Sequence, residues 1–313
     1  MTPQTAKTAS PADDARAELA AGLTAQHATL HPKFFYDTLG STLFEAICLL
    51  DEYDLTRTEA AIFDRHLPEI TRAIGPGSVF IDLGAGNCAK AAKLLPHLRP
   101  DLYVAVDIST DFLTQALAKL QDSHPALRMT SLEADFTRHF DLPREIPAEN
   151  RVFFYPGSSL GNFNPLEARA FLSHLRPKAS GLLIGIDLVK SPAELEAAYD
   201  DSLGVTAAFN LNILRRVNRE LGANFDLRAW RHRALFNPDL SRVEMHLEAR
   251  TPQTVRWPGA ARAFAQGERI HTENSYKYLP GQAEALLAAA GFKPVESWTD
   301  EQGWFGVHLG RVI

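Results

Sequence analysis

The sequence predicts an α/β protein whose core is a doubly wound, mostly parallel sheet. Short apolar runs that resemble buried strands alternate with helical segments between residues 78 and 187. The first of these runs leads directly into Gly84-Ala85-Gly86, which precedes a helix. A glycine-rich turn between a strand and a helix is typical of the edge where open α/β sheets bind their ligands.

Each element of this core has a local signal. Five apolar runs rich in β-branched and aromatic residues predict strands at 78–83, 102–107, 129–135, 151–155 and 181–187. Helical patterns between them predict helices at 89–98, 110–120 and 165–175. Three helices are expected before the first strand. They are at 14–25, at 40–45 with Ser41 or Thr42 as N-cap, and at 56–74 with the capping-box pair Thr56 and Glu59.

The alternation of strands and helices ends after Lys190. We expect mostly helix from 193 to 221, antiparallel strands between 229 and 250, an extended piece at 270–278, a helix at 282–290 and a last strand at 304–309. This pattern predicts two domains. Residues 57–190 and 281–313 would form the core, and residues 14–56 and 191–280 a smaller α+β lobe that binds the substrate. Residues 1–13 are polar and are expected to be a disordered tail.

Composition excludes several classes of function. The net charge is −6 and the basic residues are scattered, which argues against binding to nucleic acid or to anionic membranes. Two distant cysteines and unpaired histidines give no metal-ligand pattern. No run approaches the roughly 20 apolar residues of a membrane span, and the start lacks the apolar stretch of a signal peptide. We therefore expect a cytoplasmic monomer that has no metal and acts on a small molecule.

Four places along the predicted core suit S-adenosylmethionine (SAM). Gly84 and Gly86 let the backbone approach a ligand, and Asp82 precedes them as in enzymes that read D/E-x-G-x-G. Asp107 ends the second strand, where a carboxylate can accept both ribose hydroxyls. Asp135 and Phe136 end the third, where they offer a hydrogen bond and a stacking surface to adenine. Lys90 begins the helix that follows the glycines, where it could pair with the methionyl carboxylate of SAM.

The same glycines also match the G-x-G-x-x-G/A fingerprint of dinucleotide-binding proteins, because Ala89 follows at the required spacing. An NAD-dependent oxidoreductase is therefore an alternative. The carboxylate before the glycines and the Asp135-Phe136 pair favour SAM over NAD.

Seven segments between residue 31 and the C-terminus form an ordered pattern: Phe35-Tyr36-Asp37-x-x-Gly40-Ser41-x-Leu43-Phe44, Glu52-Tyr53-x-x-Thr56-Arg57-x-Glu59, Gly157-Ser158-Ser159-Leu160-Gly161-Asn162, Asp187-Leu188-Val189-Lys190, Tyr199-Asp200-Asp201 through Phe209-Asn210, Asn218-Arg219-Glu220-Leu221-Gly222, and Glu273-Asn274-Ser275-Tyr276-Lys277-Tyr278. Together they resemble the histidine-specific N-α-methyltransferases of ergothioneine biosynthesis. Those enzymes have a Rossmann-like core and convert L-histidine to its N,N,N-trimethyl derivative, hercynine.

The resemblance implies a role for each matched residue. SAM would be held by Gly84, Lys90, Asp107, Asp135 and Phe136. Asn162 would face the substrate amine and Tyr36 would lie near the reacting nitrogen, so these two are the candidate catalytic residues. The amino-acid pocket would be lined by Asn162 together with Tyr53, Tyr199, Glu273 and Ser275. Glu273 and Ser275 are two apart in an extended segment, so both point to one face and can bind two imidazole nitrogens.

Simpler interpretations of these residues remain open at this point. Tyr36 can be a core aromatic, Asn162 can cap the helix that begins at Pro165, and Glu273 can be a surface charge. The family also includes enzymes that methylate indole amino acids, so another aromatic amino acid is an alternative substrate. A lobe that senses SAM or histidine without catalysis is a further alternative.

Overall fold

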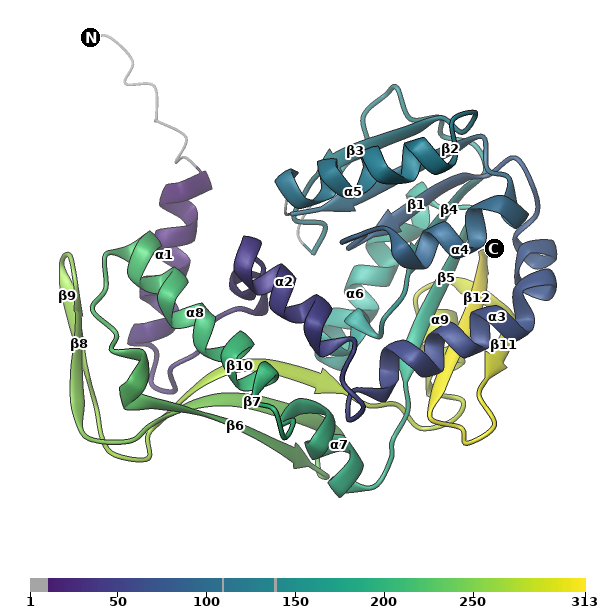
Figure 1. The fold of residues 1–313 in the computed structure, drawn as a ribbon. Coiled ribbons are helices and arrows are strands. Elements are labelled where there is room, and N and C mark those ends of the chain that lie inside the picture. The colour runs from purple at the N-terminus through teal and green to yellow at the C-terminus, as the bar shows by residue number, and fades with distance from the viewer. Residues whose placement is uncertain (1–10, 109, 138–139) are drawn as a thin grey trace, which may run out of the picture. The chain divides into compact units, whose positions relative to one another are not determined.

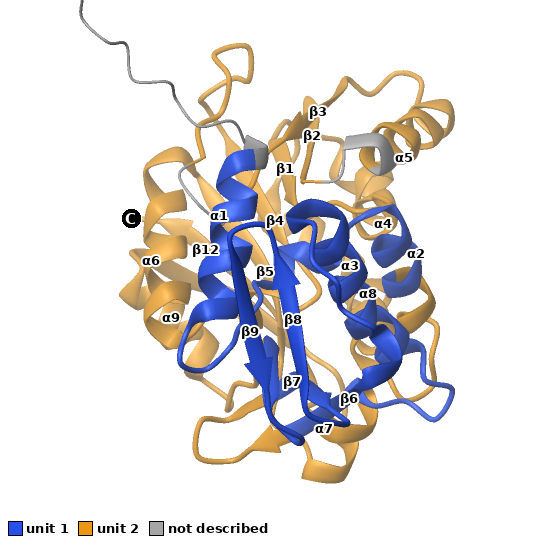
Figure 2. Cartoon of the chain, turned by 90° about the vertical axis from the view of Figure 1, so that its left-hand side faces the viewer, with its two compact units in different colours: residues 1–44, 199–235, 244–273 blue, residues 45–198, 236–243, 274–313 orange. Residues whose placement is uncertain are grey.

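The computed structural model describes residues 11–108, 110–137 and 140–313. Two compact units are present within the chain (Figure 2). Unit 1 comprises residues 1–44, 199–235 and 244–273, and unit 2 comprises residues 45–198, 236–243 and 274–313. The predicted tail at 1–13 lies outside the described residues as far as residue 10, and helix α1 (Pro11–Thr24) begins within its last three positions. The domain boundaries expected from the sequence stay a prediction.

Unit 2 is built on a seven-stranded sheet with the order β11-β12-β5-β4-β1-β2-β3 (Figure 1). Its strands are β1 (Val79–Leu83), β2 (Leu102–Asp107), β3 (Met129–Glu133), β4 (Arg151–Tyr155), β5 (Gly181–Asp187), β11 (Phe292–Thr299) and β12 (Phe305–Val312). Strands β1 to β5 run parallel, whereas β12 is antiparallel to both β5 and β11. The predicted parallel core is confirmed, and one edge of the sheet is antiparallel.

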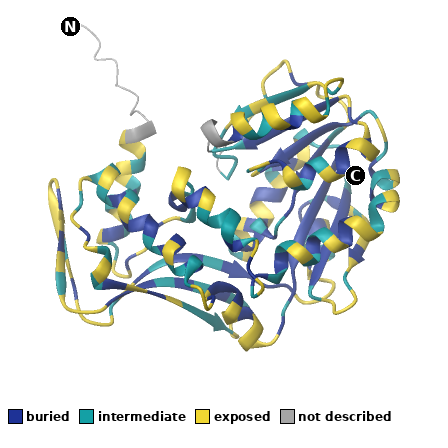
Figure 3. Cartoon of the chain, in the orientation of Figure 1, coloured by how far each residue is buried: buried dark blue, intermediate teal, exposed yellow. Residues whose placement is uncertain are grey.

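The helices of unit 2 are α3 (Asp54–Ile74), α4 (Ala89–Leu98), α5 (Thr110–Ser123), α6 (Pro165–Leu175), α7 (Pro192–Tyr199, except its last residue) and α9 (Gln282–Ala289), with short 3-10 turns η2 (Ser159–Asn162) and η3 (Arg176–Lys178). Helix α3 packs on α4 and β12, and α6 packs on α9. Every residue of β1 and β5 is buried (Figure 3). Such continuous burial explains why these strands read as unbroken apolar runs.

Unit 1 combines helices with a small sheet. It contains α1, η1 (Pro32–Phe35), most of α2 (Thr38–Ile47), α8 (Val205–Leu221) and η4 (Leu227–Ala229). Its strands are β6 (Trp230–Asn237), β7 (Arg242–Ala249), β8 (Gln253–Trp257), β9 (Ala260–Phe264) and β10 (Arg269–Tyr276). Strands β10, β7 and β6 form one sheet, β8 and β9 pair as a hairpin, and α8 packs on α1 and η1. The last residues of β6 and β10 and the first residues of β7 belong to unit 2.

Two predicted helix starts are wrong. Helix α2 begins at Thr38, and its first turn is capped by the Asp37 carboxylate, which accepts the Gly40 amide at 2.9 Å, rather than by Ser41 or Thr42. Helix α3 begins at Asp54 and has no side-chain cap. Thr56 therefore lies inside the helix, and the buried Glu59 carboxylate binds elsewhere. A capping-box spacing identifies a start only when the preceding backbone is already non-helical.

Across the described residues, no helix is long and apolar enough to cross a membrane, and no group of three or more histidine, cysteine or acidic side chains could bind a metal. The expected cytoplasmic location and monomeric state stay predictions.

Candidate active site

The glycine loop between β1 and α4 is closed onto the end of β2. Gly84 and Gly86 have φ angles of 71° and 52°, which favour glycine. The Gly84 and Ala85 amides both donate to the Val106 carbonyl, at 2.8 and 3.1 Å. The Gly86 amide donates to Asp107 Oδ2 at 3.0 Å. The structure thus brings the loop and the Asp107 carboxylate together, as the sequence predicted.

Phe136 covers the other side of this loop. A Cβ on Gly84 would lie in ordinary contact with the Phe136 ring, at 3.6 Å, so the positive φ rather than a lack of space favours glycine at this position. Phe136 packs edge-on against Tyr155, with 5.7 Å between the ring centroids. The neighbouring Asp135 accepts hydrogen bonds from the amide and hydroxyl of Thr137. Asp107 ends β2, and Asp135 lies two residues beyond the end of β3. Both carboxylates are thus at the carboxyl ends of adjacent strands.

Lys90 is bound to a buried carboxylate. Its ammonium lies 2.6 Å from Glu59 Oε2, and the Glu59 side chain is only 1% exposed. The other Glu59 oxygen accepts the Gly157 amide at 2.7 Å. Glu59 therefore joins Lys90 to the loop after β4. The sequence did not reveal this role, because the spacing of Glu59 from Thr56 predicted a helix cap instead. Its spacing of three and four residues from the buried Ile62 and Phe63 is the signal that places it on the inner face of α3.

Asp82 lies beneath the loop and is fully buried. Tyr103 donates its hydroxyl hydrogen to Asp82 Oδ2 at 2.8 Å. Burial raises the pKa of Asp82 to about 7, against the opposing effect of the Tyr103 hydrogen bond. Burial and the adjacent carboxyl raise the pKa of Tyr103 well above its usual value. Asp82 and Tyr103 thus support the loop from within the core.

The loop after β4 carries Asn162 and packs against the end of β10. A Cβ on Gly161 would lie 2.8 Å from the Tyr276 carbonyl oxygen. The loop is also tied to β5, because Ser158 Oγ accepts the Asp187 amide at 2.9 Å. Helix α6 is capped by Asn164, which accepts the Leu166 and Glu167 amides at 3.0 and 2.9 Å. The interpretation of Asn162 as that cap is therefore wrong.

Glu273 and Ser275 are both buried near the end of β10, with exposures of 8% and 4%. The interpretation of Glu273 as a surface charge is therefore wrong. Burial along β10 alternates as far as Thr272, and then Thr272 and Glu273 are buried in succession. Ser275 Oγ accepts a hydrogen bond from Lys277 Nζ at 2.9 Å, so a buried ammonium lies directly behind this hydroxyl.

The three candidate tyrosines have different surroundings. In unit 1, the Tyr36 ring is half-buried against Phe44 and Phe209, with centroids 5.7 and 5.8 Å away. Tyr199, also in unit 1, is buried, and its carbonyl contacts His232 Nε2 at 2.7 Å. Tyr53 is buried in unit 2, directly before α3.

The candidate residues are distributed over both units. Unit 1 contains Tyr36, Tyr199 and Glu273. Unit 2 contains all five candidate SAM ligands together with Tyr53, Asn162 and Ser275.

Comparison with known proteins identifies the family. The chain matches the model of the histidine-specific, SAM-dependent methyltransferases over residues 15–312. The chain belongs to this family. SAM is therefore the cofactor, as Gly84, Asp107 and Phe136 predicted, and the NAD alternative is wrong. The positive φ of Gly84 and the Asp107 carboxylate at the adjoining strand end fit this cofactor.

Several relatives align over most of this methyltransferase. A histidine N-alpha-methyltransferase of Mycolicibacterium smegmatis is 40% identical, over 96% of this chain and 95% of the relative. One of Mycobacterium tuberculosis is 39% identical, over 94% of each chain. Ergothioneine biosynthesis protein 1 of Neurospora crassa is 30% identical over 88% of this chain, which spans 32% of that longer protein.

Proposed function

We propose that this methyltransferase transfers three methyl groups from SAM to the α-amino group of L-histidine and so makes N,N,N-trimethylhistidine for ergothioneine biosynthesis. The observation that carries the proposal is the buried pair Glu273 and Ser275 on β10. A carboxylate accepts hydrogen bonds and a hydroxyl can donate one. A neutral imidazole ring provides one N–H donor and one acceptor nitrogen and therefore complements both groups.

Asn162 is the proposed contact of the α-amine. Its amide oxygen accepts an N–H of the amine and leaves the nitrogen lone pair directed at the methyl group. SAM supplies an activated methyl carbon, so the protein contributes alignment and the exclusion of water rather than a nucleophile of its own. Tyr199 and Tyr53 are proposed to bind the substrate carboxylate through their hydroxyls.

Tyr36 is proposed to act where positive charge accumulates on the amine. After each of the first two methyl transfers the amine loses one N–H proton to solvent, and the third transfer leaves a permanent cation. The aromatic cluster of Tyr36, Phe44 and Phe209 offers ring faces to such a cation, and cation–π contacts contribute about 0.5–2 kcal/mol. The mono- and dimethylated intermediates keep the same ring and carboxylate contacts, so they are expected to bind and react further.

A panel of free amino acids tests the proposal. The protein is incubated with SAM and each of histidine, tryptophan, dimethylallyltryptophan, tyrosine and phenylalanine, and the products are identified by mass and fragmentation. We expect histidine to gain three methyl groups, all on the α-nitrogen. A ring-methylated or monomethylated product at long reaction times, or a preference for an indole amino acid, would overturn the proposal.

A further inference from the structure

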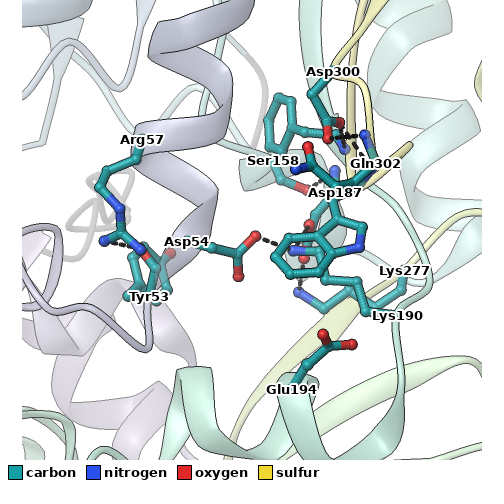
Figure 4. Close-up of polar contacts among 12 residues, drawn as sticks. Tyr53, Asp54, Arg57, Ser158, Asp187, Lys190, Glu194, Lys277, Asp300 and Gln302 are labelled. Atoms are coloured by element: carbon teal, nitrogen blue, oxygen red, sulfur yellow. Dashed lines mark hydrogen bonds and ion pairs between the residues drawn. The ribbon is translucent and has the colours of Figure 1, made fainter.

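Four charged side chains form a chain of ion pairs inside unit 2. Lys190 Nζ lies 2.8 Å from Asp187 Oδ1 and 2.5 Å from Asp54 Oδ2. Lys277 Nζ lies 2.6 Å from the other Asp187 oxygen. The side chains of Asp187, Lys190 and Lys277 are each at most 1% exposed, and Figure 4 shows them converging. Two lysines balance two aspartates, so the network is neutral, as a buried ionic cluster must be.

The network connects two residues proposed to bind the substrate. At one end, Asp54 is the first residue of α3 and directly follows Tyr53. The segment before α3 is held by Arg57, which donates to the Leu50 and Asp51 carbonyls, each at 2.6 Å. At the other end, Lys277 donates to Ser275 Oγ at 2.9 Å. Lys190 also lies over the Trp304 ring, 5.4 Å from its centroid.

The chemistry of lysine determines what Ser275 can do. An ammonium has three donors and no acceptor, so Ser275 Oγ must be the acceptor in its bond with Lys277. The single hydroxyl hydrogen of Ser275 then points away from Lys277, towards a different acceptor. Because the bond to Lys277 is charge-assisted, it polarises the hydroxyl and strengthens its donation. A second cation near this hydroxyl would be repelled by the buried ammonium.

We propose that Lys277 is a positioning residue that makes Ser275 a hydrogen-bond donor and thereby selects the neutral form of the substrate's ring. This inference rests on the proposed function, in which Ser275 contacts imidazole. Ser275 donates to the unprotonated ring nitrogen, and Glu273, two residues earlier on β10, accepts the N–H of the other. An imidazolium has no unprotonated nitrogen for Ser275 and brings a positive charge towards Lys277.

Several charged and titratable groups surround Lys277 in unit 2. Asp187 faces it from β5, and Lys190 and Asp54 are linked through Asp187. On β10, Tyr276 receives a hydrogen bond from Arg242 of β7. Burial raises the pKa of Tyr278, the next tyrosine along the chain, to about 12, so it stays neutral near pH 7. In the proposal, the group whose protonation changes between pH 5.5 and 8 is the imidazole ring of the substrate, with a reference pKa of about 6.5.

The first test uses the wild-type enzyme and two substrates. KM is measured from pH 5.5 to 8 for histidine and for 1,2,4-triazole-3-alanine, whose ring stays neutral over this range. Both share the α-amine and carboxylate, so the ratio of the two KM values isolates the ring. We expect the ratio to rise about tenfold between pH 7.5 and 5.5, because roughly one decade of ring protonation separates these conditions. A ratio that does not change with pH would overturn the proposal.

The second test removes the ammonium. Lys277→Met should raise the KM for histidine at pH 8 about tenfold, with SAM affinity unchanged, and should flatten the pH dependence of the ratio to less than about threefold. Lys277→Met combined with Asp187→Asn removes the carboxylate charge that the single change strands, and it serves if the single variant is unstable. The matched control is Lys293→Met at an exposed position of β11, which should match the wild type.

An unchanged histidine KM and pH profile in a folded Lys277→Met variant would refute the role of Lys277. Failure of the wild type to methylate histidine at all would instead refute the proposed function. The two failures are therefore distinguishable.

Discussion

Replacing Gly161 by alanine is expected to slow methyl transfer to histidine without weakening SAM binding. The added Cβ would lie 2.8 Å from the carbonyl oxygen and 3.3 Å from the amide nitrogen of Tyr276. Both are backbone atoms within a strand and cannot rotate away. The loop must therefore move by about 0.6 Å to reach ordinary contact at 3.4 Å, and it carries the adjacent Asn162 with it.

The size of the effect follows from this displacement. A misplacement of 1 Å at a reacting group costs about 100-fold in rate. On the same logarithmic scale, a shift near 0.6 Å lowers kcat/KM for histidine roughly ten- to twentyfold, or about 1.6 kcal/mol of transition-state stabilisation. The glycine loop after β1 does not contain Gly161, so the affinity for SAM should stay within about twofold.

The assay follows release of S-adenosylhomocysteine at varied histidine concentrations, with calorimetric titration of SAM and thermal unfolding alongside. Gly181→Ala is the matched control. Gly181 is the first residue of β5, at the end of the strand away from the Asn162 loop. Its added Cβ would lie 3.1 Å from the guanidinium of Arg311, the end of a long side chain. Kinetic constants for Gly161→Ala that equal those of Gly181→Ala would refute this reasoning.

Three further predictions address the cofactor, the substrate and the core. Asp107→Ala should raise the SAM dissociation constant at least tenfold in calorimetry, because two charge-assisted ribose bonds, each about 1.5–3 kcal/mol, are lost; an unchanged affinity would show that the ribose binds elsewhere. Glu273→Ala should leave an imidazole N–H unpaired, at a cost of about 1–3 kcal/mol, and should raise the histidine KM about five- to 150-fold with SAM affinity retained. Full histidine turnover at the wild-type KM would contradict the proposed pocket. Asp82 is protonated in the folded protein up to a pKa of about 7, whereas in the unfolded chain its pKa is near the ordinary value of 3.8. The folded state therefore binds the extra proton, and the contribution of Asp82 to stability falls as pH rises between these two values, by up to about 1.4 kcal/mol per pH unit. The difference in unfolding free energy between wild type and Asp82→Asn, from urea titrations at pH 5 to 8, should follow this trend, and a difference independent of pH would exclude it.

The elements with strong local signals were predicted closely from the sequence. The observed bounds of β2, β4, β5, α4 and α6 are those expected, because a doubly buried strand is a continuous apolar run and each helix between strands has a clear start and end. Elements whose stability depends on pairing were missed. Strand β11 contains Pro294 and several exposed residues and exists as the edge partner of β12, with an irregularity between Pro294 and Glu296.

The small hairpin β8–β9 was missed for a similar reason. Its strands are only five residues each. In β8, buried Val255 and Trp257 alternate with exposed Thr254 and Arg256, which is too short a pattern to stand out, and β9 is mostly exposed. The turn around Pro258 and Gly259, where Gly259 has a φ of 87°, was the available local signal.

The sequence alone predicted the cofactor edge of this methyltransferase. Gly84 follows β1 directly, Asp107 ends β2 and Phe136 lies just after β3, and the carboxyl ends of parallel strands meet at one edge of a sheet, so their order along the chain predicts that they lie together. Only the tertiary structure decided what Glu59, Asp187 and Lys277 do. Lys190 and Asp54 are 136 residues apart in the chain, and Glu59 and Gly157 are 98 apart. Sequence spacing predicts contacts within a helix or strand. The partner of a buried charge, in contrast, depends on which distant segments the tertiary fold packs against it.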